Sequence, residues 1–311
     1  MDWRIKGAIQ KVLTYVPRGG DIHYYLQRRG GGLTDFTREC DIKVDDWRLM
    51  VGQLRTIGAK VRGGTLLEMG TGWYPTFPIC LTLAGASRVY TYDLNRYLKP
   101  EMATALVHRP AEHVPLIARE SGRSEAEVRA HQQGIAAALD RGASVTEATN
   151  GVIVYQAPAD ASDTKLDDSS VDVVFSNSVL EHVPGPVIED CLREAMRILR
   201  PGAYVFHSVN CGDHYAYADK RIHQLNYLQF SNASWEKWNN GFLYQNRLRA
   251  VDFTEMAKRS GFAIVSDTSR AKPERLRQLD SIRVHADFNR YSREQLAITS
   301  IDFIGQKPQR A

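Results

Sequence analysis

From residue 64 onward, short apolar segments alternate with helical ones, and this alternation limits the fold more than any other feature of the chain. Strands are predicted at 65–69, 88–93, 151–156, 171–176, 203–209, 262–267 and 298–307, with helices at 78–85, 186–200 and 253–261. The segments at 151–156 and 171–176 are rich in valine or isoleucine and apolar on both faces, which is typical of strands buried inside a parallel sheet. The pattern therefore predicts an α/β fold, an open and mostly parallel seven-stranded sheet with helices on both faces. In such sheets the ligand binds beyond the carboxyl ends of the strands.

About 60 residues precede the first predicted strand, and we expect them to form an N-terminal helical extension. Apolar residues share one face of its first helix: Ile5, Ile9, Val12, Leu13 and Val16. Such a helix can lie on an anionic membrane surface, but docking on the chain's own domain is the favoured interpretation. A short aromatic helix is expected at 23–26 and a further helix at 43–58.

Composition excludes several classes of protein. The chain has 311 residues and a formal charge of +4, which is too mild to indicate nucleic-acid binding. Its four cysteines include no C-x-x-C pair, so neither a zinc site nor a disulfide framework is predicted. No stretch has the roughly 20 apolar residues that a membrane span requires, and the amino terminus lacks the apolar core of a signal peptide. A cytoplasmic location is the resulting expectation.

The loop after the first predicted strand begins like a dinucleotide-binding loop and then departs from it. Gly70 and Gly72 have the spacing of a tight turn, and they let the backbone approach a ligand closely. The dinucleotide fingerprint requires a third glycine at position 75, where the chain has Pro75. Asp93 ends the second strand, where a carboxylate can accept hydrogen bonds from both ribose hydroxyls. These residues predict a nucleoside bound without a pyrophosphate bridge, rather than NAD.

Five motifs in the correct order make the chain similar to the class I S-adenosylmethionine-dependent methyltransferases. They are Glu68-Met69-Gly70-Thr71-Gly72, Asp93-Leu94, Asp160-Ala161 with LDDSSVDVVFS, SNSVLEHV at 176–183, and MRILRPGAYV. The resemblance covers approximately residues 60 to 270 and implies a Rossmann-like fold of the small-molecule type, with S-adenosyl-L-methionine as the cofactor. It implies that the cofactor is bound by Glu68, Gly70, Thr71, Gly72, Asp93, Leu94, Asp160, Ala161 and Asn177.

Some of these assignments have competitors. Asp163 competes with Asp160, because the loop ADASD could shift its register, and Asn177 could instead cap the next helix. Two departures from the family pattern are the bulky Trp73-Tyr74 in the first loop and a helical insertion at about 98–150. We expect the charged, alanine-rich part of that insertion to form a solvated helical pair. The methyltransferase domain is expected to span 61–311, with a lid or acceptor region at about 213–247.

The acceptor side has two candidate bases. The sulfonium already makes the methyl group electrophilic, so no metal is predicted, and a hydroxyl acceptor needs a group that takes its proton. His182 is the first candidate base, just past the fourth strand, and His214 is the second, with Asp213 beside it in sequence. His207 lies within the fifth strand and is expected to be structural. Eight aromatics between 213 and 247 suggest an acceptor pocket, with Tyr215, Trp235 and Tyr244 as candidate contacts, or ordinary core.

The predicted function is O-methylation of a small-molecule, natural-product or sugar-like acceptor, without nucleic acid or stable membrane insertion. A homodimer is left open. An N-methyltransferase acting on a small molecule or peptide is one alternative. A nicotinamide-dependent oxidoreductase and a non-catalytic cofactor-binding scaffold are alternatives of another class. Methylation of the amino groups of nucleic-acid bases is disfavoured. Enzymes of that kind share an N-P-P-Y or D-P-P-Y segment after the fourth strand, where this chain has Ser176-Asn177-Ser178-Val179.

Overall fold

The computed structural model describes residues 2–17, 22, 25, 29 and 35–309. The aromatic helix expected at 23–26 lies outside the described residues, apart from Tyr25. Among the described residues, no helix is both long enough and apolar enough to cross a membrane.

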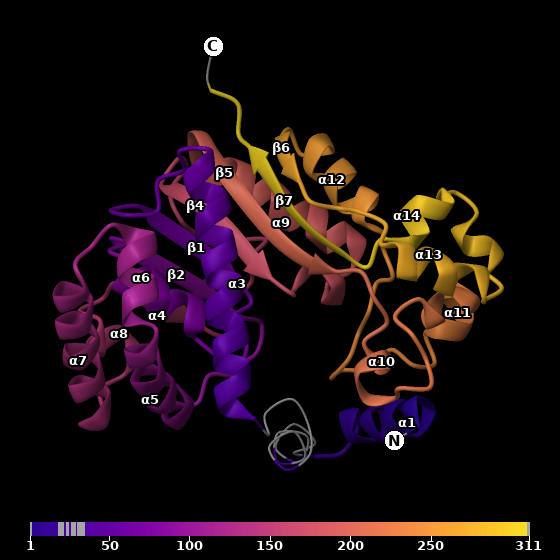
Figure 1. Ribbon diagram of the computed structural model, residues 1–311, viewed down its shortest axis with the longest axis horizontal. Helices are drawn as coiled ribbons and strands as arrows, with labels where there is room; N and C mark the ends of the chain where they lie inside the picture. The colour runs from indigo at the N-terminus through magenta and orange to yellow at the C-terminus, as the bar shows by residue number, and fades with distance from the viewer. Residues whose placement is uncertain (1, 18–21, 23–24, 26–28, 30–34, 310–311) are drawn as a thin grey trace.

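A single seven-stranded sheet forms the centre of the described structure (Figure 1). Its strands are β1 (Thr65–Met69), β2 (Arg88–Tyr92), β3 (Ile153–Gln156), β4 (Val171–Asn177), β5 (Leu199–Asn210), β6 (Ala263–Asp267) and β7 (Ser300–Gln306). The strand order is β3-β2-β1-β4-β5-β7-β6. The first five strands are parallel, and β7 runs antiparallel between β5 and β6. The predicted mostly parallel seven-stranded sheet is therefore confirmed, with the order reversing between β1 and β4, which is where such sheets bind ligands.

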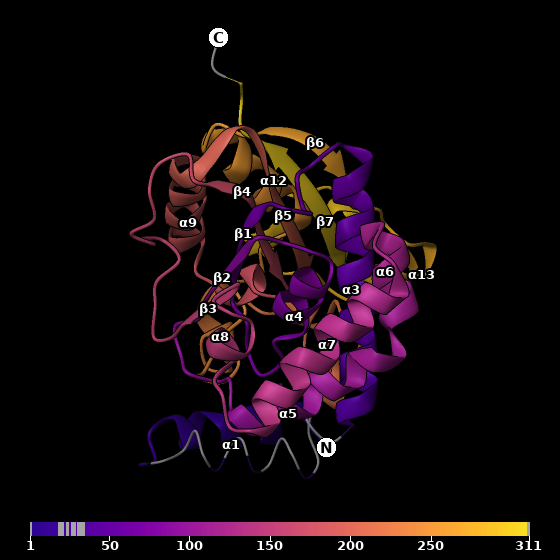
Figure 2. The same ribbon diagram turned by 90° about the vertical axis from the view of Figure 1, so that its left-hand side faces the viewer.

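Helices cover both faces of the sheet, as Figure 2 shows. On one face, α3 (Phe36–Thr56) and α4 (Thr76–Leu83) bury apolar side chains against the strands in one core cluster. On the other face, α9 (Gly185–Ile198) and α12 (Ala250–Arg259) do the same in a second cluster. Since α3 shares its core with the sheet, the second half of the N-terminal extension is part of the layered domain rather than an appendage.

The helical insertion between β2 and β3 packs beside α4 at one end of the sheet (Figure 1). It contains α5 (Pro100–His108), η1 (Arg109–Glu112), α6 (Val114–Ser121), α7 (Glu125–Asp140) and α8 (Val145–Ala148). Two helices were expected to be a solvated pair, and their charged faces are exposed. Their apolar residues, such as Ile117, Val128 and Ile135, are completely buried in the first core cluster. The insertion thus enlarges the core, because its helices have an apolar stripe to bury.

The two segments that lie before α12 and after β6 build a separate lobe around a third apolar cluster. It contains α10 (Tyr215–Ala218), η3 (Asn226–Gln229), α11 (Asn232–Trp235), α13 (Pro273–Asp280), η4 (Ala286–Phe288) and α14 (Arg293–Ala297). The N-terminal helix α1 (Trp3–Thr14) lies against this lobe (Figure 1). Its buried residues are Trp3, Gly7 and Gln10, whereas the apolar residues predicted to form its docking face are mostly exposed. Docking on the chain's own domain is confirmed, but through another face of the helix.

Candidate functional site

The turn after β1 has the backbone that its two glycines predicted. Gly70 and Gly72 both have positive φ, +78° and +64°, a region that L side chains rarely adopt. A Cβ on Gly70 would lie 2.6 Å from a methyl carbon of Val179, so the loop after β1 and the loop after β4 are in close contact. A Cβ on Gly72 would meet nothing within 4 Å. Space for a ligand therefore remains beside Gly72, not beside Gly70.

Asp93 ties this turn to the end of β2. Its carboxylate accepts hydrogen bonds from the backbone N–H of Gly72 at 2.8 Å and of Asn95 at 3.1 Å. Burial is the largest influence on the Asp93 carboxyl and raises its pKa, while these two backbone donors lower it. Asp93 is 8% exposed, and its two carboxylate oxygens have further lone pairs for a ligand hydroxyl.

Glu68 is linked to the same loop through side-chain hydrogen bonds. Thr91 donates a hydrogen bond to its carboxylate at 2.6 Å, and Thr91 in turn is bonded to Thr71. Burial raises the pKa of Glu68 to about 7. Glu68 and Thr71 thus act on the shape of the loop through side-chain hydrogen bonds inside the protein.

Two residues predicted to bind the cofactor, Leu94 and Asp160, lie open at the same sheet edge. Leu94 is 65% exposed directly after Asp93, which is unusual for a large apolar side chain. Asp160 is also exposed, and its Oδ1 accepts hydrogen bonds from the backbone and hydroxyl of Ser162. Its competitor Asp163 is paired with Lys165. This pairing favours Asp160 as the residue available to a ligand, with Ala161 half-buried beside it.

The bulky residues of the first loop pack on aromatic rings from two other segments. The Trp73 ring lies 4.8 Å from that of Tyr97, in the loop after β2. Tyr74 packs against Phe36 at the start of α3, with ring centroids 5.8 Å apart. Aromatic rings from three segments therefore close this side of the edge, which explains how Trp73-Tyr74 fits into the fold.

Lys43 is a site residue that sequence analysis did not find. It lies on α3, and its ammonium donates a hydrogen bond to Oδ1 of Asn177 at the carboxyl end of β4. The same ammonium is close enough to lower the pKa values of Glu68, Asp46 and Glu181, although burial raises each of them overall. The 134 residues between Lys43 and Asn177 explain why no local motif indicated the contact.

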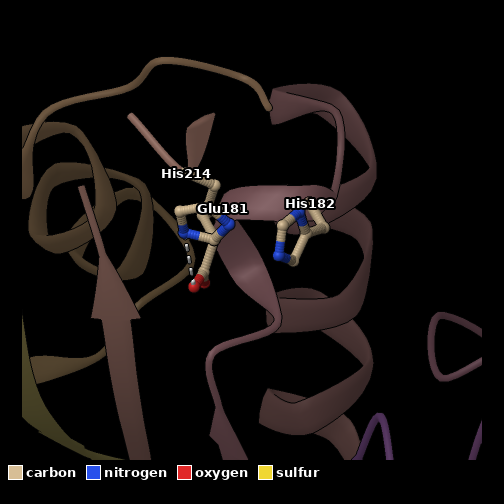
Figure 3. A group of neighbouring side chains, drawn as sticks. All are labelled: Glu181, His182 and His214. Atoms are coloured by element: carbon tan, nitrogen blue, oxygen red, sulfur yellow. Dashed lines mark ion pairs between the residues drawn. The ribbon is translucent and has the colours of Figure 1, made fainter. Parts of the chain in front are cut away.

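The two candidate histidines are brought together, and a buried glutamate joins them (Figure 3). The rings of His182 and His214 lie 4.9 Å apart in an edge-to-face arrangement. Glu181 is 3% exposed, and its Oε1 lies 4.0 Å from Nε2 of His214. One potential ligand atom from each of the three residues lies within 4.8 Å of the other two. The short η2 helix (Leu180–His182) supplies two of them, and the loop after β5 supplies the third.

Hydrogen bonds and burial fix the state of these groups. Nδ1 of His182 lies 2.6 Å from the carbonyl oxygen of Tyr244, which can only accept, so Nδ1 carries the proton and Nε2 has the free lone pair. Burial lowers the pKa of His182 and lowers that of His214 to about 3. Burial raises the pKa of Glu181 to about 8. Near neutral pH the protein alone therefore holds two neutral imidazoles beside a largely protonated carboxyl.

Asp213 and His207 have structural roles. Asp213 is fully buried and accepts hydrogen bonds from Asn226 and from the backbone of Tyr215, so it does not pair with His214 as its position in sequence suggested. His207 is buried in β5, and its Nδ1 lies 2.7 Å from the hydroxyl of Ser176. The expectation that His207 is structural agrees with this placement.

A family model for a methyltransferase domain matches residues 119–207. The match runs through β3 and β4, ends within β5, and includes Asp160, Asn177, Glu181 and His182. This part of the chain is a methyltransferase domain. The match supports the predicted methyltransferase family and enzyme class, and with them S-adenosylmethionine as the cofactor. No curated protein matches the sequence.

Solved structures with similar folds are distant in sequence. One is an S-adenosylmethionine-dependent methyltransferase from Mesorhizobium loti, with 15% identity, a TM-score of 0.44, and coverage of 82% of this chain and 96% of that one. Phosphoethanolamine N-methyltransferase 2 from Haemonchus contortus has 15% identity and a TM-score of 0.47, with 85% of this chain and 53% of that chain covered. Geranyl diphosphate C-methyltransferase from Streptomyces coelicolor A3(2) has 12% identity and a TM-score of 0.46, with 83% and 78% covered.

The acceptor side of this methyltransferase differs from the residue predictions. Tyr215 and Trp235 are each 1% exposed in the third apolar cluster, where Trp3 packs on both rings. Their placement favours the core interpretation over acceptor contact. Tyr244 contributes its backbone carbonyl to His182. Tyr217, which was not predicted, is 55% exposed with its ring 5.6 Å from that of His214.

Proposed function

We propose that this methyltransferase methylates a hydroxyl group of a small-molecule acceptor, of natural-product or sugar-like type. When bound, S-adenosylmethionine supplies an electrophilic methyl group. The observation that carries the proposal is the paired histidines at the carboxyl edge of β4 and β5. A neutral imidazole with a free Nε2 is suited to take the proton that a hydroxyl must lose.

The residues at the carboxyl edge fit the cofactor. The unfilled space beside Gly72 allows backbone to approach the methionine portion, and Asp93 at the end of β2 offers carboxylate oxygens to ribose hydroxyls. The exposed Leu94 offers an apolar surface to the adenine ring, and Asp160 offers an acceptor to its amino group. Glu68, Thr71 and Asn177 are assigned to shaping the loops around it.

In the proposed reaction, His182 accepts the acceptor proton, since the Tyr244 carbonyl holds the ring in the required tautomer. His214 lies next to it as the second candidate base. Tyr217 is assigned to contact with the acceptor, because its exposed ring adjoins His214. Nitrogen acceptors are the alternative, and they depend less on a base when they already carry a lone pair.

Calorimetry and an acceptor screen test the proposal. The purified protein should bind S-adenosylmethionine and not NAD, and formation of S-adenosylhomocysteine should identify acceptors within a set of hydroxylated and amino compounds. With the best acceptor, His182→Ala should lower turnover by roughly 10²–10⁴ and leave cofactor affinity nearly unchanged. His108→Ala is the matched control, because His108 is exposed on α5 of the insertion and paired with Asp140. Turnover on amines only, or less than a tenfold loss in His182→Ala, would contradict hydroxyl methylation with this base.

A further inference from the structure

We propose that Glu181, His182 and His214 form a site for a divalent cation of the Zn²⁺ class, and that this cation binds the acceptor oxygen. The inference rests on the proposed function for its acceptor. In this inference the bound cation lowers the pKa of the acceptor hydroxyl, and His182 is a ligand of the cation instead of taking the proton directly.

The donor set and its spacing suit such a cation. Two imidazole nitrogens and one carboxylate oxygen are ligands that zinc prefers, whereas Mg²⁺ prefers oxygen ligands alone. The three potential ligand atoms lie within 4.8 Å of one another. Around a cation with bonds of about 2.0–2.1 Å, ligand atoms lie roughly 3.0–3.4 Å apart. Side-chain rotations that move the ligand atoms by about an ångström would therefore complete the site. Figure 3 shows the three side chains lying close together.

Independent of the spacing, two polar atoms of this cluster lack partners. Oε2 of Glu181 and Nε2 of His214 are both buried and have no hydrogen-bond partner among the described residues. Glu181 is almost completely buried, and a buried carboxyl oxygen without a partner costs free energy comparable to a lost hydrogen bond or more. A cation between these two atoms would satisfy both. His207 also has an unpartnered nitrogen, but no carboxylate or second histidine joins it in a comparable group among the described residues.

The surroundings already orient one ligand as metal sites do. Metal-bound histidines usually donate their other ring N–H to a backbone carbonyl or carboxylate, which fixes the tautomer. The contact between Nδ1 of His182 and the Tyr244 carbonyl has this form. Glu181 is held by the backbone N–H of Asn210, which donates to Oε1 at 3.3 Å. Two ammonium groups disfavour a bound cation, because they place positive charge nearby: Lys43 lies near Glu181 and Lys6 near His214. Lys43 is already hydrogen-bonded to Asn177.

Three protein ligands leave at least one coordination position for the acceptor, as in catalytic zinc sites. Binding there lowers the pKa of the hydroxyl, and its proton passes to solvent. The oxygen lone pair then forms the O–C bond while the methyl–sulfur bond breaks, and the bonding pair goes to sulfur. No oxidant or reductant is needed. The acceptor class is therefore a hydroxyl compound, favoured further if a second oxygen can chelate the same cation.

The test uses untagged, chelator-treated protein titrated with Co²⁺, followed by Zn²⁺. We expect visible absorption bands from Co²⁺ at one equivalent, their loss when Zn²⁺ displaces it, and one-to-one Zn²⁺ binding by calorimetry. His214→Ala and the isosteric Glu181→Gln should each weaken binding by at least about tenfold. The His108→Ala variant should bind Co²⁺ and Zn²⁺ as the wild type does, because His108 is an exposed residue paired with Asp140. Folding of each variant is checked by circular dichroism and S-adenosylmethionine affinity.

The outcomes separate this inference from the proposed function. Absence of Co²⁺ bands and of stoichiometric Zn²⁺ binding, or binding that neither Glu181→Gln nor His214→Ala weakens, would overturn the cation site. Methyl transfer at full rate by the chelator-treated protein would also overturn it and leave His182 as the direct base. Failure to bind S-adenosylmethionine would instead refute the proposed function, whatever the metal result.

Discussion

The single residues of the cofactor-binding motifs at the carboxyl edge contribute to the site in different ways. Gly70 and Gly72 are needed for backbone conformation, and only Gly72 leaves open space. Asp93 has two roles: its carboxylate accepts a hydrogen bond from the Gly72 N–H, and its remaining lone pairs are proposed to accept from the ribose hydroxyls. Asp160 is exposed, and its carboxylate accepts a hydrogen bond from the backbone N–H of Ser162 in a local turn. Their substitutions should therefore have different consequences for cofactor binding.

Asp93→Ala should weaken S-adenosylmethionine binding by on the order of 1–3 kcal/mol, because the ribose hydroxyls lose an acceptor and the Gly72 N–H loses its partner. Calorimetric titration with S-adenosylmethionine measures the change. Asp163→Ala is the matched control, since Asp163 pairs with Lys165 on the same edge. Equal affinities for wild type and Asp93→Ala would refute the ribose assignment, and a loss confined to Asp163→Ala would move the adenine contact from Asp160.

Among the elements, α1 shows how an amphipathic pattern can mislead. Its exposed apolar side chains include Ile5 and Val12, at 57% and 63% exposure, whereas the opposite face meets the lobe. Trp3 packs among Tyr215, Trp235 and Trp238, and its backbone N–H donates to Asp219. A Cβ on Gly7 would lie 2.9 Å from the Tyr215 hydroxyl oxygen, so close approach of the helix depends on this glycine.

Two glycine-to-alanine changes in helices should therefore have opposite effects. Gly134→Ala in α7 meets nothing within 4 Å and should stabilise by up to about 1 kcal/mol through helix propensity. Gly7→Ala should lose that gain to overpacking, which costs typically about 1–3 kcal/mol. The melting temperature and the rate of tryptic cleavage within α1 measure both. A Gly7→Ala protein as stable and protease-resistant as Gly134→Ala would mean that α1 does not pack on Tyr215.

For the molecule as a whole, buried ionisable groups set how stability depends on pH. His207 and His214 have folded pKa values lowered to about 3 by burial, so the unfolded chain binds protons more readily below its ordinary histidine pKa. Their contribution to stability is present above about pH 6.5 and is lost as the pH falls toward 3. Glu68 and Glu181 act in the other direction, with pKa values raised to about 7 and 8. Their contribution is present below about pH 4.3 and is lost as the pH rises through these values.

Glu181→Gln isolates one of these groups. In the presence of a chelator, the melting temperature of the variant should rise relative to wild type between about pH 4.5 and 8, because the amide cannot ionise in the unfolded chain. Glu236→Gln, an exposed site, is the control and should follow the wild-type pH dependence. Parallel curves for Glu181→Gln and wild type across this range would show that Glu181 does not titrate as a buried carboxyl.

The sheet and the cofactor loops could be predicted from sequence, because both depend on local patterns. Apolar periodicity and glycine spacing act over a few residues, so the seven strands and the turn at Gly70 and Gly72 were found where the structure has them. The SNSVLEHV segment is a local pattern as well, and its family likeness predicts His182 as a candidate base. The sequence leaves Asp160 and Asp163 as competitors, and the pairing of Asp163 with Lys165 favours Asp160.

Packing over long sequence distances decided the rest. Lys43 reaches Asn177 across 134 residues, and the loop after β5 carries His214 to Glu181 and His182. Aromatic residues at irregular spacing looked alike in the sequence, yet Tyr215 and Trp235 are core while Tyr217 is exposed beside His214. Burial depends on which segments meet in space, and so does the pKa of every group they enclose. The strand pattern places the carboxyl edge, but the chain folded over that edge determines which side chains meet there.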